Sequence, residues 1–130
     1  NYLQMALKNG YRVKIISGGN SPEVMDRLNK LGVSDVHMSV QDKGTLLADW
    51  MKAEKLKKEE VLFMGDDLPD LPALKLAGLP ACPADAADEI KKIAHYISPL
   101  KGGEACVREL IEKVLRINGH WEYRVDVSSR

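Results

Sequence analysis

Short apolar stretches alternate with segments whose apolar residues recur at helical spacing along most of this 130-residue sequence. Each apolar stretch runs into a cluster of Gly, Ser, Asn or Asp, a pattern typical of a strand followed by a loop. The alternation predicts βαβ units and therefore an α/β fold with a mostly parallel sheet. The predicted strands cover residues 12–16, 35–38, 61–64, 79–82 and 96–97, and the predicted helices cover residues 2–8, 22–31, 44–54, 70–77 and 103–117.

The ends of these segments indicate one domain. Ser21 and Pro22 have the residue types expected at the N-cap and first position of a helix. Neither a repeat nor a linker divides the chain, so residues 1–119 are expected to form a single domain. Residues 120–130 form a tail without a clear period, and its Trp121 and Tyr123 predict docking onto a partner surface.

Composition and charge exclude several classes of protein. The 19 basic and 19 acidic residues give a net charge of 0, which leaves no basic face for nucleic acid. The sequence contains no run of about 18 apolar residues that would span a membrane. Cys82 and Cys106 fall in different predicted elements. They are therefore expected to be reduced, buried thiols in a cytoplasmic protein rather than a disulfide.

Three carboxylates follow a buried strand within five residues, namely Asp66, Asp67 and Asp70. They repel one another unless a cation lies between them. Mg²⁺ fits because it prefers oxygen ligands and takes one or two carboxylates together with water and phosphate. The alternative is that Asp67 or Asp70 only caps the helix that follows.

Two further polar segments follow predicted strands, so all three groups are expected at the carboxyl edge of the sheet, where such folds bind ligands. Ser17 precedes Gly18-Gly19, whose backbone N–H groups would approach an anion, although this segment is also typical of an ordinary turn. Lys43 begins a helix, where a cation is slightly unfavourable. It is either a ligand-binding residue or a solvated surface lysine.

The three segments in this order resemble the haloacid dehalogenase superfamily of phosphatases. The segment from Gly102 to Glu109 is similar to a late segment of its capless branch, which includes 3-deoxy-D-manno-octulosonate 8-phosphate phosphatases. The resemblance implies a three-layer Rossmann-like domain and a magnesium-dependent phosphoric monoester hydrolase. It also implies a small phosphorylated sugar acid as substrate and a homotetramer. The segments that carry the resemblance are Lys14-Ile15-Ile16-Ser17-Gly18, Asp42-Lys43 and Gly65-Asp66-Asp67-Leu68-Pro69-Asp70.

The resemblance also implies a role for each matching residue. Asp66 would ligate Mg²⁺, and Asp70 would support the metal shell. Arg27 would contact the substrate carboxylate, for which a guanidinium is suited, unless it is only a surface side chain. The implied catalytic residues are Ser17, Lys43 and Asp67, and the implied substrate-binding residues are Ser17, Gly18, Arg27 and Lys43.

Two departures from the family pattern stand out. The family's Asp-x-Asp motif, whose first Asp becomes phosphorylated, is absent from this sequence, and no carboxylate precedes Ser17. We therefore expect the first strand and its nucleophile to lie upstream of Asn1. Relatives often carry Arg where this chain has Gly19 or Asn20, which leaves the sugar acid open. A phosphatase for a related nine-carbon sugar acid phosphate is therefore an alternative. A silent assembly domain of the same fold is the main alternative. A phospho-acceptor signalling domain is disfavoured because its Lys follows its acidic residues.

Overall fold

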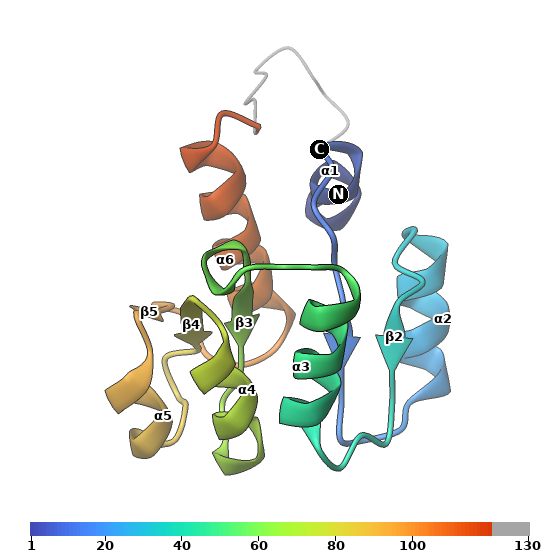
Figure 1. Ribbon diagram of the computed structural model, residues 1–130. Helices are drawn as coiled ribbons and strands as arrows, with labels where there is room; N and C mark the ends of the chain where they lie inside the picture. Colours follow the sequence, from blue (N-terminus) through green and yellow to red (C-terminus); the bar gives the residue numbers. More distant parts are fainter. Residues whose placement is uncertain (121–130) are drawn as a thin grey trace.

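The computed structural model describes residues 1–120 as an α/β fold with two parallel sheets (Figure 1). One sheet pairs β1 with β2, and the other has the order β3-β4-β5. The predicted α/β class with parallel strands is confirmed, and no pairing joins β1 to β3 among these residues. The strands are β1 (Ile15–Ile16), β2 (Val36–His37), β3 (Leu62–Met64), β4 (Leu79–Cys82) and β5 (Tyr96–Ile97).

Six α-helices and two 3₁₀ helices connect the strands of the described part. Five of the helices agree with the sequence pattern to within a few residues. The sixth, α5, was not predicted from the sequence. The helices are α1 (Tyr2–Lys8), α2 (Pro22–Lys30), α3 (Lys43–Ala53), η1 (Lys58–Glu60), η2 (Leu68–Asp70), α4 (Leu71–Leu76), α5 (Asp88–Ile93) and α6 (Glu104–Ile117).

Side-chain caps fix the starts of α2 and α3. The Val24 amide donates to Ser21 Oγ over 3.4 Å, which confirms the predicted N-cap of α2. Asp42 caps α3 by accepting from the Thr45 amide over 3.0 Å. Because Asp42 is the cap, Lys43 becomes the first residue of α3, one residue earlier than predicted.

The core consists of separate apolar clusters rather than one continuous layer. Helices α1 and α6 are in contact, and so are α3 and α4, as Figure 1 shows. Leu47 of α3 packs near Ala73 of α4, whereas Leu74, on another face of α4, packs with Ile90 of α5. Helix α4 therefore joins two clusters and holds the loop before it in place.

The predictions about thiols and membranes have clear outcomes. Cys82 and Cys106 are both buried and free, as expected. None of the helices within residues 1–120 is long and apolar enough to cross a membrane. The expected docking tail, residues 121–130, lies outside the described residues.

Candidate active site

Asp70 is the centre of the polar cluster at the carboxyl end of β3. Its side chain is 6% exposed, and its Oδ1 accepts a hydrogen bond from Lys43 Nζ over 2.6 Å. Its Oδ2 accepts from the backbone amides of Asp66 at 2.9 Å and Asp67 at 3.2 Å. Both carboxylate oxygens are therefore engaged, and Asp70 folds the loop after β3 around itself.

Two glycines allow the chain segments around this ion pair to approach closely. A Cβ on Gly65 would lie 2.5 Å from Asp70 Cβ and 2.7 Å from its Cγ. A Cβ on Gly44 would lie 2.7 Å from Pro72 Cβ. The first glycine lets the Asp70 side chain lie against the backbone at the end of β3. The second lets α3 approach α4, which brings Lys43 within reach of Asp70.

The carboxylates of this cluster differ in their electrostatics. Burial by itself raises the pKa of Asp70, but the Lys43 hydrogen bond and two backbone amides outweigh it, so the pKa lies below its ordinary 3.8. Asp66 shows the opposite shift. Partial burial and the neighbouring charge of Asp70 raise the pKa of Asp66 above 3.8. The Asp66 carboxylate therefore lies where an added positive charge would be favourable.

Asp67 has a structural role in the loop. Its side chain caps η2 by accepting a hydrogen bond from the Leu68 amide over 2.8 Å. The capping alternative for Asp67 is thus present in the structure, and its predicted catalytic role stays a prediction. Asp67 is exposed, so capping leaves part of the carboxylate open to solvent.

The Ser17–Ser21 loop follows the carboxyl end of β1. The Ser17 amide donates to His37 O over 2.9 Å, and the Gly19 amide donates to Ser17 Oγ over 3.1 Å. The Ser39 amide donates to Gly19 O over 2.7 Å, with Ser39 in the left-handed region at φ 55°. This turn is held by its own backbone, and Gly18 within it is exposed. The phosphate-binding roles of Ser17 and Gly18 stay predictions.

Arg27 is the predicted site residue on the helix that follows the Ser17–Ser21 loop. It is exposed in the last turn of α2, whereas the Ser17–Ser21 loop precedes the first turn of that helix. Burial raises the pKa of the Tyr2 phenol, and the charge of Arg27 opposes that shift. A contact between Arg27 and substrate stays a prediction.

The loop after β5, which contains Gly102, also lies close to the Asp66–Asp70 cluster. A Cβ on Gly102 would lie 3.4 Å from Asp85 Oδ1 and 3.9 Å from Asp66 Oδ2. The Gly102 amide donates to Asp85 Oδ1 over 2.7 Å. The sequence pointed to Gly102 through the segment that is similar to the capless branch, and no sequence signal distinguished Asp85.

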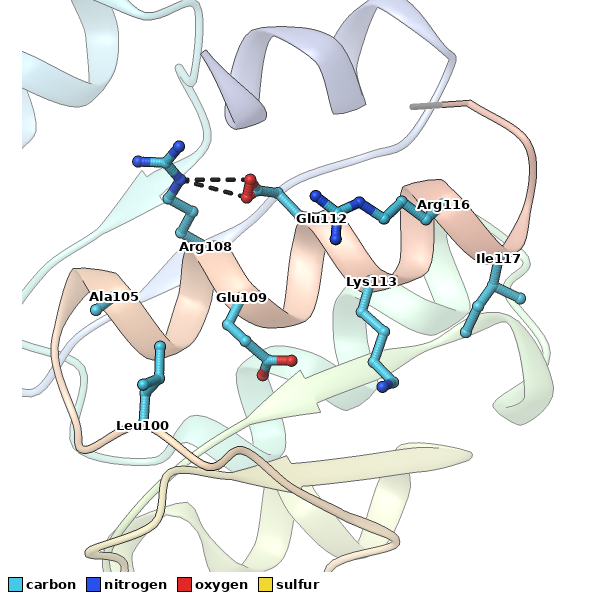
Figure 2. A pocket seen from close by; sticks show the side chains of 8 residues that line it. All are labelled: Leu100, Ala105, Arg108, Glu109, Glu112, Lys113, Arg116 and Ile117. Carbon is cyan, nitrogen blue, oxygen red and sulfur yellow. Dashed lines mark hydrogen bonds and ion pairs between the residues drawn. The ribbon is translucent and has the colours of Figure 1, made fainter. Parts of the chain in front are cut away.

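A separate hollow of about 610 Å³ lies along α6 and includes none of the predicted site residues (Figure 2). Arg108 and Glu112 form an ion pair on one side of the helix, and Glu109 and Lys113 point to the other side. The carboxylate cluster after β3 remains the candidate active site, because it contains the predicted residues Lys43, Asp66 and Asp70.

Comparison with known proteins identifies the family. A family model described as haloacid dehalogenase-like hydrolase matches residues 29–110. The chain belongs to this family. It is 33% identical over 103 residues to the 3-deoxy-D-manno-octulosonate 8-phosphate phosphatase of Yersinia pestis, covering 79% of this chain and 55% of that protein. It is 30% identical over 117 residues to the Escherichia coli K12 phosphatase of the same name, covering 90% of this chain and 62% of that protein.

Solved structures of haloacid dehalogenase-like proteins agree with the fold. A probable phosphatase from Pseudomonas syringae has a TM-score of 0.85 and 34% identity, with 92% of this chain and 68% of that chain covered. The 3-deoxy-D-manno-octulosonate 8-phosphate phosphatase of Moraxella catarrhalis, solved with magnesium, phosphate and the sugar acid, has a TM-score of 0.83 and 31% identity. That comparison covers 88% of this chain and 66% of the other. The chain spans about 55–62% of the length of the curated relatives it matches.

Proposed function

We propose that this chain is part of a magnesium-dependent phosphatase that hydrolyses a phosphorylated 3-deoxy keto-sugar acid, 3-deoxy-D-manno-octulosonate 8-phosphate. The observation that carries the proposal is the Asp66 carboxylate beside the Lys43–Asp70 ion pair at the end of β3. Relatives that are about 30% identical over most of this chain bear the name of that phosphatase. The Moraxella catarrhalis relative binds magnesium, phosphate and the sugar acid.

The residues at this site fit Mg²⁺. Within residues 1–120 no three His, Cys, Asp or Glu side chains gather as a complete ligand set. Mg²⁺ does not need one, because it keeps several waters and binds one or two carboxylates plus substrate phosphate. Both oxygens of Asp70 already accept hydrogen bonds, so Asp66 would be the direct ligand from this chain and Asp70 would hold it in place.

The chain's own residues would bind and orient the phosphoryl group. Ser17 Oγ would donate a hydrogen bond to a phosphoryl oxygen, and the exposed Gly18 backbone would allow that oxygen to approach. Lys43 would supply positive charge to the phosphoryl group, and Asp70 would fix the position of the ammonium. Bound Mg²⁺ would supply further positive charge at the transferred group.

The nucleophile of the proposed reaction is an Asp upstream of Asn1. Its carboxylate oxygen would form a bond to phosphorus while the bond from phosphorus to the sugar oxygen breaks, and a proton would pass to that sugar oxygen. Water would then attack phosphorus, release phosphate and restore the carboxylate. The unlinked β1-β2 and β3-β4-β5 sheets support an upstream strand, because such a strand would have partners in β1 and β3. By family resemblance the whole protein would be a cytoplasmic homotetramer.

The test is phosphate release by the full-length protein from the sugar-acid phosphate, with and without Mg²⁺. Wild type should be active only with Mg²⁺, and Asp66→Asn should lose more than 100-fold in rate while unfolding at an unchanged urea concentration. Asp49→Asn, at an exposed position in α3, is the matched control and should keep full activity. Full activity in Asp66→Asn would refute its role as metal ligand. A wild-type protein that is inactive with every sugar-acid phosphate would favour the silent assembly domain.

A further inference from the structure

Two loops that follow neighbouring parallel strands are tied together beside the Asp66 carboxylate. The loop after β4 donates from the Ala84 amide to Leu100 O over 2.8 Å, and the Gly102 amide donates back to Asp85 Oδ1 over 2.7 Å. The loop after β4 is also tied to the loop after β3, because the Ala87 amide donates to Asp66 O over 2.9 Å. Asp85 is the only side chain in this set of contacts, and the other groups are backbone.

The loop after β5 forms one wall of the candidate active site at Gly102. A Cβ at that position would lie 3.9 Å from Asp66 Oδ2, which is ordinary contact distance. The next residue, Gly103, is in the left-handed region at φ 124°, and its carbonyl accepts a hydrogen bond from Cys106 Sγ over 3.1 Å. A molecule bound at Asp66 would therefore meet the chain at Gly102, whose amide donates to Asp85.

We propose that Asp85 is a positioning residue, which holds the Gly102-Gly103 turn against the Asp66 site by accepting the Gly102 amide hydrogen bond. This inference rests on the proposed function. The turn would contact the part of the substrate that does not react, in the ground state and the transition state alike. Loss of the contact therefore raises KM more than it lowers kcat.

The role belongs to the acceptor oxygen and not to the negative charge of Asp85. Asp85→Asn keeps an Oδ1 acceptor of the same shape and removes the charge, whereas Asp85→Ala removes both. A charge acting on the metal would be lost in both variants. The pair of substitutions thus separates a hydrogen bond that positions the loop from an electrostatic effect.

The experiment measures kcat and KM for the sugar-acid phosphate in the full-length protein with Mg²⁺. Asp85→Ala should raise KM about fivefold to tenfold, the loss expected for one net hydrogen bond, with kcat changed less than threefold. Asp85→Asn should restore KM to within twofold of wild type. Asp88→Ala, at an exposed position in the first turn of α5, is the matched control and should leave both constants unchanged.

A second readout follows the contact directly. Hydrogen exchange at the Gly102 amide should become faster in Asp85→Ala and stay slow in Asp85→Asn, at equal midpoints of urea unfolding. Unchanged KM in Asp85→Ala, or an equal loss in both Asp85 variants, would overturn this inference alone. An inactive wild-type protein would instead overturn the proposed function, and this inference with it.

Discussion

Lys43 Nζ lies 2.6 Å from Asp70 Oδ1, so an ion pair joins the first residue of α3 to the last residue of η2. The two side chains are 16% and 6% exposed. A carboxylate this buried is held in its charged form by the ammonium and by two backbone amides. The same contact sets the position of the cation that the proposed reaction uses, so the stability of this loop and its chemistry are coupled.

Lys43→Met should destabilise the protein and also reduce its activity. The substitution leaves the Asp70 carboxylate buried with its two amide donors only, which should cost about 2 kcal/mol of unfolding free energy. Phosphate release should fall more than 100-fold, because the positive charge at the phosphoryl group is lost. Urea unfolding and steady-state kinetics of the full-length protein measure the two effects. Lys52→Met, exposed on the same helix, should change neither, and a fully active Lys43→Met would make Lys43 a purely structural residue.

Gly65→Ala should lower stability because its Cβ has no room. The added carbon would lie 2.5 Å from Asp70 Cβ, so the Asp70 side chain would have to move away from the amides it accepts from. We expect a loss of about 2 kcal/mol in urea unfolding. Gly19→Ala is the control, since its Cβ would come no closer than 3.7 Å to Ser17 Oγ. Equal stability of the two variants would show that the Asp70 loop adjusts without cost.

Gly44→Ala reverses the usual effect of this substitution in a helix. Alanine is normally better than glycine in a helix by about 1 kcal/mol. Here the new Cβ would lie 2.7 Å from Pro72 Cβ, so we expect a net loss of about 1 kcal/mol of unfolding free energy. The rate of phosphate release should also fall, because a displaced α3 would move Lys43 away from Asp70. A double-mutant cycle with Pro72→Gly checks the cause. The two substitutions together should cost less than the sum of each alone, and simple additivity would contradict the steric explanation.

Local signals in the sequence predicted most of the elements and the edge at which the site lies. Ser21-Pro22 marked the start of α2, and the Gly65–Asp70 segment was correctly placed after a strand. The prediction that this strand is buried was wrong, because Leu62 of β3 is exposed and Phe63 and Met64 are only partly buried. Contacts between residues that are distant in the sequence were not predicted. The Lys43–Asp70 pair joins residues 27 positions apart, and no periodicity specifies such a partner. The sequence pointed to Lys43 as a contact for a phosphoryl group, and the structure adds the carboxylate that holds it.

The division of the strands into two sheets could not be predicted either, because a strand pattern does not state which strands are neighbours. The short helix α5 and the Asp85 contact to Gly102 fell in a segment that contains two Ala-Asp steps and no clear period. Sequence patterns indicate which faces of each element are apolar. They do not indicate which loops come into contact once those faces are packed.

Mg²⁺ binding by the full-length protein should weaken as pH falls towards the pKa of Asp66. Partial burial and the charge of Asp70 raise this pKa above 3.8, so the proton competes with the metal at a higher pH than for an ordinary aspartate. Calorimetric titration with Mg²⁺ at a series of pH values measures the effect, and proton release on binding should grow as pH falls. In Asp66→Asn the remaining affinity should be nearly independent of pH over the same range. An equally steep dependence in that variant would assign the proton to another group.

The Tyr96 hydroxyl donates to Glu109 Oε2 over 2.6 Å, while Glu109 Oε1 is buried without a hydrogen-bond partner among residues 1–120. Burial and the Glu109 carboxylate raise the pKa of Tyr96 to about 12, above its ordinary 10.0. Because the folded state holds this proton more tightly than the unfolded state, the stabilisation is complete below pH 10 and is lost as pH rises towards 12.

Tyr96→Phe removes this hydrogen-bond donor and tests whether the Tyr96 proton is linked to folding stability. At pH 7 the variant should be less stable by about 1.5 kcal/mol, because the Glu109 carboxylate loses its hydrogen bond. Urea unfolding at pH 7, 9 and 11 should show that the difference in unfolding free energy between the variant and wild type is smallest at pH 11. Tyr96→Phe combined with Glu109→Leu should recover stability, since it removes the buried carboxylate together with its donor. A difference that stays constant with pH would mean that the Tyr96 proton is not linked to folding.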